Sequence, residues 1–223
     1  MISPLRYFLK YESPELPDSN EFSFSFHNKG EPMAPHLEEE SRALLADYLG
    51  KSSVFLEYGS GGSTFLALDS NVSEVHSVES DLGFMSSILD QIDSLGLKSK
   101  FYPYPCDIGP TGAWGTPLSR ESSTRWMLYP FSVWWKLMLH GSSPDLILID
   151  GRFRVSCFLA SLWLSKEGTV ILLDDYIGRP YYHVVERFIS PLRMAGRMAV
   201  FKKPLGLGIR FLPYLMLHLV DFR

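Results

Sequence analysis

The chain has 223 residues and a formal net charge of −4. This length fits one domain with a real hydrophobic core, and a content of 46% hydrophobic and 14% aromatic residues excludes an intrinsically disordered chain. The mild negative charge gives no global attraction to nucleic acid or to anionic lipid. The two cysteines, Cys106 and Cys157, have neither a CxxC nor a Cys/His spacing, which argues against a disulfide scaffold or a structural zinc site.

The beginning of the chain lacks the pattern of a secretion signal, since Lys10 and Glu12 come before any long apolar run. No window has the roughly 18 apolar residues that a membrane span needs. We therefore expect a cytoplasmic protein with a small-molecule partner and with neither a nucleic-acid nor a membrane partner. The irregular first segment offers one route to a homo-oligomer, but the sequence does not reveal the oligomeric state.

The chain begins with a segment that is rich in Pro, Ser and Phe and has no clear period. We interpret residues 1–36 as an irregular arm or lid and residues 37–223 as a single domain. A helix is predicted over 37–49, where apolar residues recur at helical spacing and Gly50 ends the pattern.

The rest of the chain alternates short apolar runs with helical patterns. Strands are predicted at residues 54–58, 74–79, 100–104, 146–150 and 169–174, and helices at 64–68, 84–95, 129–139, 155–164 and 181–189. A long loop is expected over 105–125, and a closing hairpin over 197–201 and 207–212. This alternation predicts an α/β fold: a Rossmann-like, doubly wound, mostly parallel sheet with helices on both faces. Such sheets bind ligands beyond the carboxyl ends of their strands.

A glycine-rich turn follows the first predicted strand, in the sequence Glu57-Tyr-Gly59-Ser-Gly61-Gly-Ser-Thr64. Glycines let the chain turn sharply and bring backbone N–H groups close to a ligand. We expect Glu57 to face the crevice, where its carboxylate can neutralise a cationic ligand group. Glu79 ends the second strand and can accept both hydroxyls of a ribose. Taken singly, a tight turn and a solvated strand end explain these features equally well.

Residues 56–64 and 78–80 together resemble the first two motifs of class I S-adenosylmethionine-dependent methyltransferases. The resemblance covers roughly residues 37–212 and implies a seven-stranded sheet with an antiparallel last strand and S-adenosylmethionine as the cofactor. It implies that the glycine turn approaches the methionine part of the cofactor, that Glu79 binds the ribose and that Asp107 contacts the adenine. A turn at Asp-Ile-Gly explains Asp107 equally well. The cofactor-binding residues predicted in this way are Glu57, Gly59, Ser60, Gly61, Ser63, Thr64, Glu79, Asp107 and Asp150.

Three further acids, Asp150, Asp174 and Asp175, end the fourth and fifth predicted strands. Neighbouring carboxylates repel one another unless they are paired, protonated or bound to a cation, and an all-oxygen set of ligands suits Mg²⁺. The pattern resembles the metal-dependent macrocin and catechol O-methyltransferase-like enzymes. That resemblance implies that the three acids hold Mg²⁺ and that Asp150 and Asp174 are catalytic.

Nearby arginines leave an alternative to the metal open. Arg152, Arg154 and Arg179 are close in sequence to the three acids and could form salt bridges with them. Arg152 is also a candidate for binding an anionic substrate, because a guanidinium suits carboxylate and phosphate groups. Trp114 in the long loop and Tyr176 after the fifth strand are further candidates for substrate binding.

The sequence therefore predicts an S-adenosylmethionine-dependent methyltransferase that acts on a hydroxyl of a small molecule or sugar. Mg²⁺, where bound, would lower the pKa of that hydroxyl and orient it. Two other functions stay open. One is a catalytically silent binding or scaffold protein on the same fold. The other is a nicotinamide-dependent oxidoreductase, against which Glu57 and Thr64 argue because they depart from the dinucleotide-binding pattern.

Overall fold

A seven-stranded sheet forms the centre of the molecule in the computed structural model, which describes residues 33–97 and 100–223. The strands are β1 (Val54–Tyr58), β2 (Glu74–Glu79), β3 (Phe101–Pro105), β4 (Leu146–Ile149), β5 (Val170–Leu173), β6 (Arg193–Ala195) and β7 (Met198–Lys202). Their order is β3-β2-β1-β4-β5-β7-β6. Strands β1 to β5 run parallel, and β7 is antiparallel to both β5 and β6. The predicted fold is confirmed. Most of the predicted arm, residues 1–32, lies outside the described residues.

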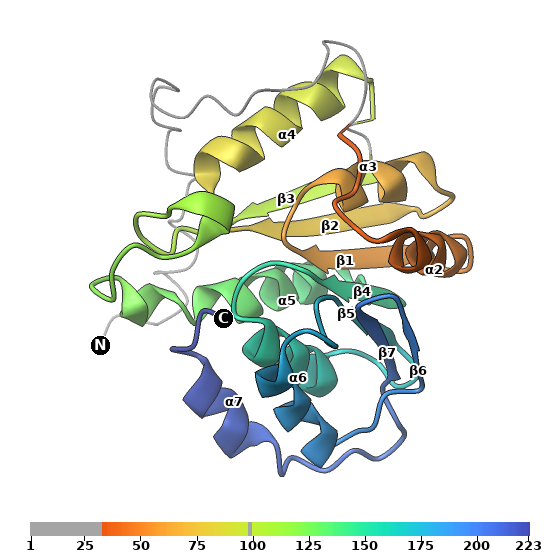
Figure 1. The fold of residues 1–223 in the computed structure, drawn as a ribbon. Helices are drawn as coiled ribbons and strands as arrows, with labels where there is room; N and C mark the ends of the chain where they lie inside the picture. The colour runs from red at the N-terminus through yellow and green to blue at the C-terminus, as the bar shows by residue number, and fades with distance from the viewer. Residues whose placement is uncertain (1–32, 98–99) are drawn as a thin grey trace.

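Helices cover both faces of the sheet. They are α2 (Glu39–Leu49), α3 (Gly62–Asp69), α4 (Leu82–Ser94), α5 (Leu128–His140), α6 (Arg154–Leu164) and α7 (Leu212–His218), with 3₁₀ turns η2 (Ala113–Gly115), η3 (Ser123–Arg125) and η4 (Pro180–Arg187). Helices α2, α3 and α4 lie on one face, and α5, α6 and α7 lie on the other (Figure 1). No helix in the part of the chain that the structure describes is long and apolar enough to cross a membrane.

The central strands are buried on both sides, which explains their continuous apolar runs. Successive side chains of a strand point to opposite faces. In β4, Leu146 and Leu148 therefore pack with the α2–α4 layer, and Ile147 and Ile149 pack with the α5–α7 layer. The sequence pattern of this strand could not be mistaken for a half-exposed one.

The local capping residues agree with the helix boundaries. The Asp81 side chain accepts a hydrogen bond from the Phe84 N–H at 2.9 Å and so caps the start of α4. Gly141 ends α5 in the left-handed conformation, with φ of 69°. The long loop over 105–125 is confirmed as the stretch between β3 and α5, with two short 3₁₀ turns inside it.

The predicted closing hairpin is wrong in its second strand. Strand β7 pairs with β5 on one side and with β6 on the other, so its two edges are already taken. The hairpin partner is β6, which precedes β7, and Gly196 turns between them with φ of +52°. Pro213 lies in the first turn of α7, where proline favours helix initiation, and the chain after Phe211 is therefore helical.

The predicted helix over 181–189 is a 3₁₀ segment, η4, instead of an α-helix. Its buried side chains, Tyr182 and Val185, are three residues apart, as a period of three residues per turn requires. The apolar spacing indicates a helix, and the structure shows that this helix has the tighter 3₁₀ geometry.

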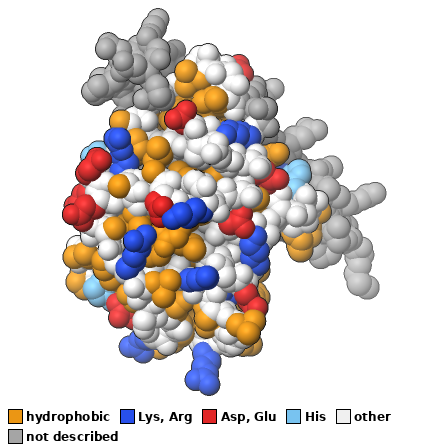
Figure 2. Space-filling view, turned by 90° about the vertical axis from the view of Figure 1, so that its right-hand side faces the viewer, with side chains coloured by type: hydrophobic (Ala, Val, Ile, Leu, Met, Phe, Trp, Pro, Cys, Tyr) orange, Lys and Arg blue, Asp and Glu red, His pale blue; other side chains and the backbone are white. Residues whose placement is uncertain are grey.

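The surface that Figure 2 shows, seen from the right-hand side of Figure 1, mixes acidic and basic side chains with apolar ones. Charges of one sign do not gather there into a continuous field of the kind that binds a nucleic-acid backbone.

Candidate functional site

A cavity of about 480 Å³ opens at the carboxyl ends of the parallel strands. It lies where β1 and β4 are neighbours, which is the point at which the strand order reverses and where α/β sheets bind ligands. Its walls are residues 33–37, 59–63, 79–81, 114–116 and 150–152, together with Phe84, Tyr129, Arg154, Asp175, Arg179 and Arg197.

Glycines in the turn after β1 allow two other segments to come close. Gly59 has φ of +98°, and a Cβ there would stand 2.7 Å from backbone atoms of Gly151. A Cβ on Gly62 would stand 2.2 Å from backbone atoms of Ala34 and Pro35. A Cβ on Gly61, by contrast, would meet nothing within 4 Å. Gly61 therefore borders open space in the cavity, as a ligand-facing position would.

Glu57 does not face the crevice, and that expectation is wrong. Its side chain is fully buried beneath the turn, and its carboxylate accepts hydrogen bonds from the hydroxyls of Ser63, Thr64 and Ser77 at 2.5–2.7 Å. Burial raises the pKa of Glu57 to about 7, against the opposing effect of these hydroxyls. Ser63 and Thr64 are thus occupied in holding Glu57, and all three residues support the turn from below.

Glu79 lies in the cavity wall, and its predicted contact with a ribose stays a prediction. One carboxylate oxygen accepts the Ser60 N–H at 3.0 Å, and the other accepts the N–H groups of Ser80 and Asp81 at 2.7 and 2.8 Å. Burial raises the pKa of Glu79 in spite of these donors. The carboxylate joins the glycine turn to the end of β2.

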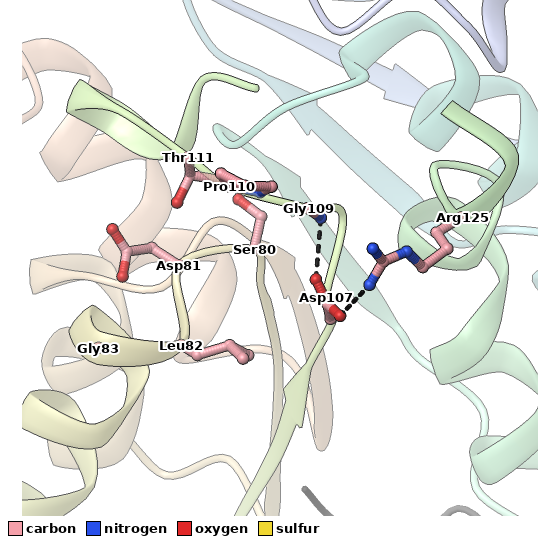
Figure 3. Close-up of a pocket in the computed structure, with 9 residues that line it drawn as sticks. All are labelled: Ser80, Asp81, Leu82, Gly83, Asp107, Gly109, Pro110, Thr111 and Arg125. Carbon is pink, nitrogen blue, oxygen red and sulfur yellow. Dashed lines mark hydrogen bonds and ion pairs between the residues drawn. The ribbon is translucent and has the colours of Figure 1, made fainter. Parts of the chain in front are cut away.

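Asp107 lies in a second hollow of about 440 Å³, which shares Ser80 and Asp81 with the main cavity (Figure 3). Its carboxylate accepts the Gly109 N–H at 2.8 Å and pairs with the Arg125 guanidinium. The turn predicted as the alternative is therefore present. The same side chain lines the hollow, so the predicted adenine contact stays a prediction.

The acids at the ends of β4 and β5 come together, with ligand atoms of Asp150, Asp174 and Asp175 all within 4.8 Å of one another. Asp174 is fully buried, and its Oδ2 is 2.8 Å from Arg197 Nη2. Asp175 is 3.1 Å from Arg197 Nε. The turn between β6 and β7 thus supplies a guanidinium to the end of β5.

Two more arginines complete this cluster, which we call the carboxylate–guanidinium cluster. Arg154 pairs with Asp150 at 3.0 Å and with Asp175 at 3.2 Å, and Arg179 pairs with Asp175 at 2.8 Å. The cluster therefore consists of Asp150, Asp174, Asp175, Arg154, Arg179 and Arg197. Burial and the two neighbouring carboxylates raise the pKa of Asp150, although Arg154 opposes the shift.

Arg154 is the fixed centre of the cluster. It is almost fully buried and donates to three backbone carbonyls, those of Asp150 at 2.7 Å, Gly151 at 3.0 Å and Asp174 at 2.8 Å. A movement of the guanidinium away from the acids would therefore break these three hydrogen bonds as well.

The cluster does not fit the predicted Mg²⁺ site as it stands. Every one of the three carboxylates has a guanidinium nitrogen within 3.2 Å, and three positive charges balance the three negative ones. Among the described residues, one buried oxygen, Asp174 Oδ1, has no hydrogen-bond partner. A hard divalent cation needs about six oxygen ligands. Guanidinium groups already pair with Asp150 Oδ1, Asp174 Oδ2 and both oxygens of Asp175, which leaves too few of the three acids' oxygens for such an ion. The salt-bridge alternative describes the geometry better, with Arg197 as the third arginine where Arg152 was expected.

The three predicted substrate-binding residues differ in position. Arg152 lines the cavity, with Nη1 3.4 Å from the Thr116 hydroxyl and with no acidic partner among residues 33–97 and 100–223. Trp114 also lines it and is 74% exposed. Tyr176 does not, and this prediction is wrong. It is buried, stacked on His183, and its hydroxyl donates to Glu186 at 2.5 Å.

Sequence reasoning missed two parts of the site. Arg197 belongs to the turn between β6 and β7 and is 23 residues from Asp174, so no local pattern joins them. His36 lies in the cavity wall, with its ring 5.7 Å from that of Trp114 and its carbonyl accepting from Arg197 at 2.8 Å. A residue at the end of an irregular segment gave no signal of this position.

Comparison with solved structures finds the same fold in methyltransferases. A methyltransferase-like protein from Silicibacter pomeroyi is 32% identical, with a TM-score of 0.77, over 85% of this chain and 98% of that one. An O-methyltransferase from Bacillus cereus in complex with SAH is 18% identical, with a TM-score of 0.50, over 74% and 82% of the two chains. The O-methyltransferase TomG from Streptomyces achromogenes in complex with SAM is 13% identical, with a TM-score of 0.53, over 75% and 81%. No protein-family model and no curated protein matches the chain.

Proposed function

This chain belongs to the class I S-adenosylmethionine-dependent methyltransferase superfamily, and from that premise we propose that it methylates a hydroxyl of a small, anionic acceptor. The proposal that the chain binds this cofactor rests on one observation, the hydrogen bond that joins the glycine turn to Glu79. The turn is held from below by Glu57, its Ser60 N–H is tied to Glu79, and Gly61 borders open space in the cavity.

The residues in the cavity wall fit S-adenosylmethionine. Backbone at Gly59 and Gly61 would border its methionine part, and Glu79 would accept the ribose hydroxyls. Asp107, in the adjoining hollow, stays the candidate for the adenine. When bound, this cofactor supplies a methyl group on a positively charged sulfur, which is already activated for attack. The protein then has to orient the acceptor, exclude water and take up a proton.

Asp150 is our candidate for holding the proton of the acceptor hydroxyl. Among the three acids of the carboxylate–guanidinium cluster, its side chain is the most exposed, at 28% against 17% for Asp175 and none for Asp174. It lines the cavity, as Asp174 does not. Its raised pKa makes it a better proton acceptor than an ordinary aspartate.

Arg152 supports an anionic acceptor. Its Nε is buried and has no hydrogen-bond partner in the described part of the chain, and leaving a buried donor unpaired costs about 1–3 kcal/mol. A carboxylate or phosphate on the acceptor would satisfy this guanidinium in bidentate fashion. Trp114, exposed at the same wall, offers a face on which a ring of the acceptor could stack.

The test is methyl transfer from isotope-labelled S-adenosylmethionine to a panel of hydroxylated acids and their neutral amides or esters. We expect transfer to a hydroxylated acid, with Arg152→Gln raising its KM at least tenfold and leaving the KM of a neutral analogue unchanged. Arg125→Gln, at the neighbouring hollow, serves as the control for a general loss of cavity charge. Transfer to nitrogen acceptors alone, or an equal effect of Arg152→Gln on acidic and neutral acceptors, would contradict the proposed acceptor class.

A further inference from the structure

The carboxylate–guanidinium cluster has the charge and the contacts of a site that is already neutralised. Two carboxylates at contact distance from each other need a compensating positive charge, and three need more. Arg197 forms ion pairs with Asp174 and Asp175. Arg154 forms ion pairs with Asp150 and Asp175, and Arg179 forms one with Asp175. All six side chains lie within the described residues, and each acid is paired at 3.2 Å or less.

Backbone conformation and backbone hydrogen bonds also hold the three acids and the three arginines together. Asp175 has φ of 58°, a left-handed conformation that is strained for a residue with a side chain. In this conformation its carboxylate meets all three guanidinium groups. Arg197 is held further by the carbonyl of His36, and its own N–H donates to Glu38 at 3.0 Å. Contacts from three separate segments, residues 36–38, 150–151 and 174–175, therefore fix the arginines in place.

We propose that the three arginines, Arg154, Arg179 and Arg197, take the place of a divalent cation among the three acids, so that this enzyme works without a metal. The inference rests on the proposed function, because it concerns how the acceptor side of that site is held. Its chemical content is that guanidinium groups neutralise the acids permanently. A guanidinium remains charged at any physiological pH and cannot be removed by a chelator.

The first test measures metal binding directly, in the absence of cofactor and acceptor. The purified protein, treated with EDTA and desalted, is titrated with Mn²⁺, and free Mn²⁺ is followed by electron paramagnetic resonance. We expect no stoichiometric binding up to millimolar Mn²⁺. One Mn²⁺ bound per chain with micromolar affinity, and lost in Asp174→Asn, would overturn the proposal.

The second test asks whether an arginine really stands where a cation would. Arg197→Gln removes one positive charge next to the fully buried Asp174, so the Tm of this variant should be lower than that of the wild type. Mn²⁺ or Ca²⁺ should restore several degrees of that loss, because an ion that binds only the folded state stabilises it. The matched control, Arg187→Gln, removes an exposed arginine whose partner is the Tyr214 hydroxyl. The proposal is supported if the cation raises the Tm of Arg197→Gln and leaves the Tm of the wild type and of Arg187→Gln unchanged.

A lack of rescue in Arg197→Gln would contradict the substitution of guanidinium for metal, since the acids would then have no capacity for a cation. Neither test involves S-adenosylmethionine. A failure of the proposed methyltransferase activity is seen separately, as the absence of methyl transfer, and leaves both metal measurements readable.

Discussion

The acids on the two sides of the cavity are satisfied in opposite ways. After β1 and β2, Glu57 and Glu79 receive hydrogen bonds from neutral donors, which are serine and threonine hydroxyls and backbone N–H groups. After β4 and β5, the aspartates receive guanidinium groups. Burial raises the pKa of both glutamates, and no cationic partner among the residues that the structure describes offsets it. The first side is a polar frame without fixed positive charge, and the second is an ion-pair cluster.

The difference suits a site that holds a cation-bearing cofactor on one side and an anionic acceptor on the other. Neutral donors leave the first side free of positive charge, so it does not repel a sulfonium or an ammonium group. On the second side, Arg152 stands beside the paired carboxylate–guanidinium cluster, donates to the Thr116 hydroxyl at 3.4 Å, and is the contact that we propose for an anion. Variants that remove single groups from each side test this difference.

Removal of Arg154 should produce the largest loss of stability. Arg154→Met leaves Asp150 and Asp175 without their shared, buried guanidinium, and breaking a buried ion pair in this way costs about 3–5 kcal/mol. The free energy of unfolding in urea measures the loss. Arg187→Met, the exposed control, should lose less than about 1 kcal/mol. Equal losses in the two variants would mean that the cluster is not what holds this end of the sheet.

On the other side, Glu57 predicts a pH effect. Its pKa is about 7 in the folded protein and near 4.5 when exposed, so between these values the folded state binds more protons than the unfolded state. Its contribution to the free energy of unfolding therefore falls as pH rises from 4.5 to 7, by up to about 3 kcal/mol. Glu57→Gln cannot ionise and should lack this component. Parallel pH profiles of unfolding for wild type and variant would refute the assignment.

Two glycines of the same turn should separate folding from binding. Gly59→Ala forces a side chain into a left-handed conformation against Gly151, at a cost of about 1–3 kcal/mol, and should lower both Tm and the affinity for S-adenosylhomocysteine. A Cβ on Gly61 would have no atom of the described residues within 4 Å, so Gly61→Ala should keep its Tm and lose only affinity. Thermal unfolding and calorimetric titration give the two values. An unchanged affinity in Gly61→Ala would place the cofactor elsewhere.

The smallest effects are expected from two aromatic residues outside the charged groups. Tyr176→Phe removes a hydroxyl that donates to Glu186 and should cost about 1 kcal/mol of stability without changing the acceptor KM. Trp114→Ala removes an exposed ring and should leave Tm unchanged while raising that KM. Steady-state kinetics and thermal unfolding of both variants measure these effects. A raised acceptor KM in Tyr176→Phe, with an unchanged KM in Trp114→Ala, would restore Tyr176 as a substrate contact.

Much of the fold and of the first side was readable from the sequence because its contacts are local. Strand β4, for example, is a continuous apolar run of four residues. Glycine at positions 59 and 61 indicates a tight turn, and this signal does not depend on distant residues. Such signals depend on neighbours in sequence, and a single chain suffices to find them.

The second side was only half readable because its partners come from distant segments. The acids stood out at the ends of two strands, but their third arginine, Arg197, reaches them only once β7 has paired with β5. The orientation of Glu57 was missed for a related reason. Whether a strand-end side chain points into a crevice or beneath a turn depends on the neighbouring strand, here through Ser77 of β2.

The most direct measurement is calorimetric titration of the EDTA-treated protein with S-adenosylhomocysteine, for wild type and for Glu79→Gln, with Tm recorded for both. The account predicts one molecule bound per wild-type chain without added metal, and affinity at least tenfold weaker in a folded Glu79→Gln. An absence of binding to the wild type, or equal affinity in a folded Glu79→Gln, would contradict the proposed cofactor site.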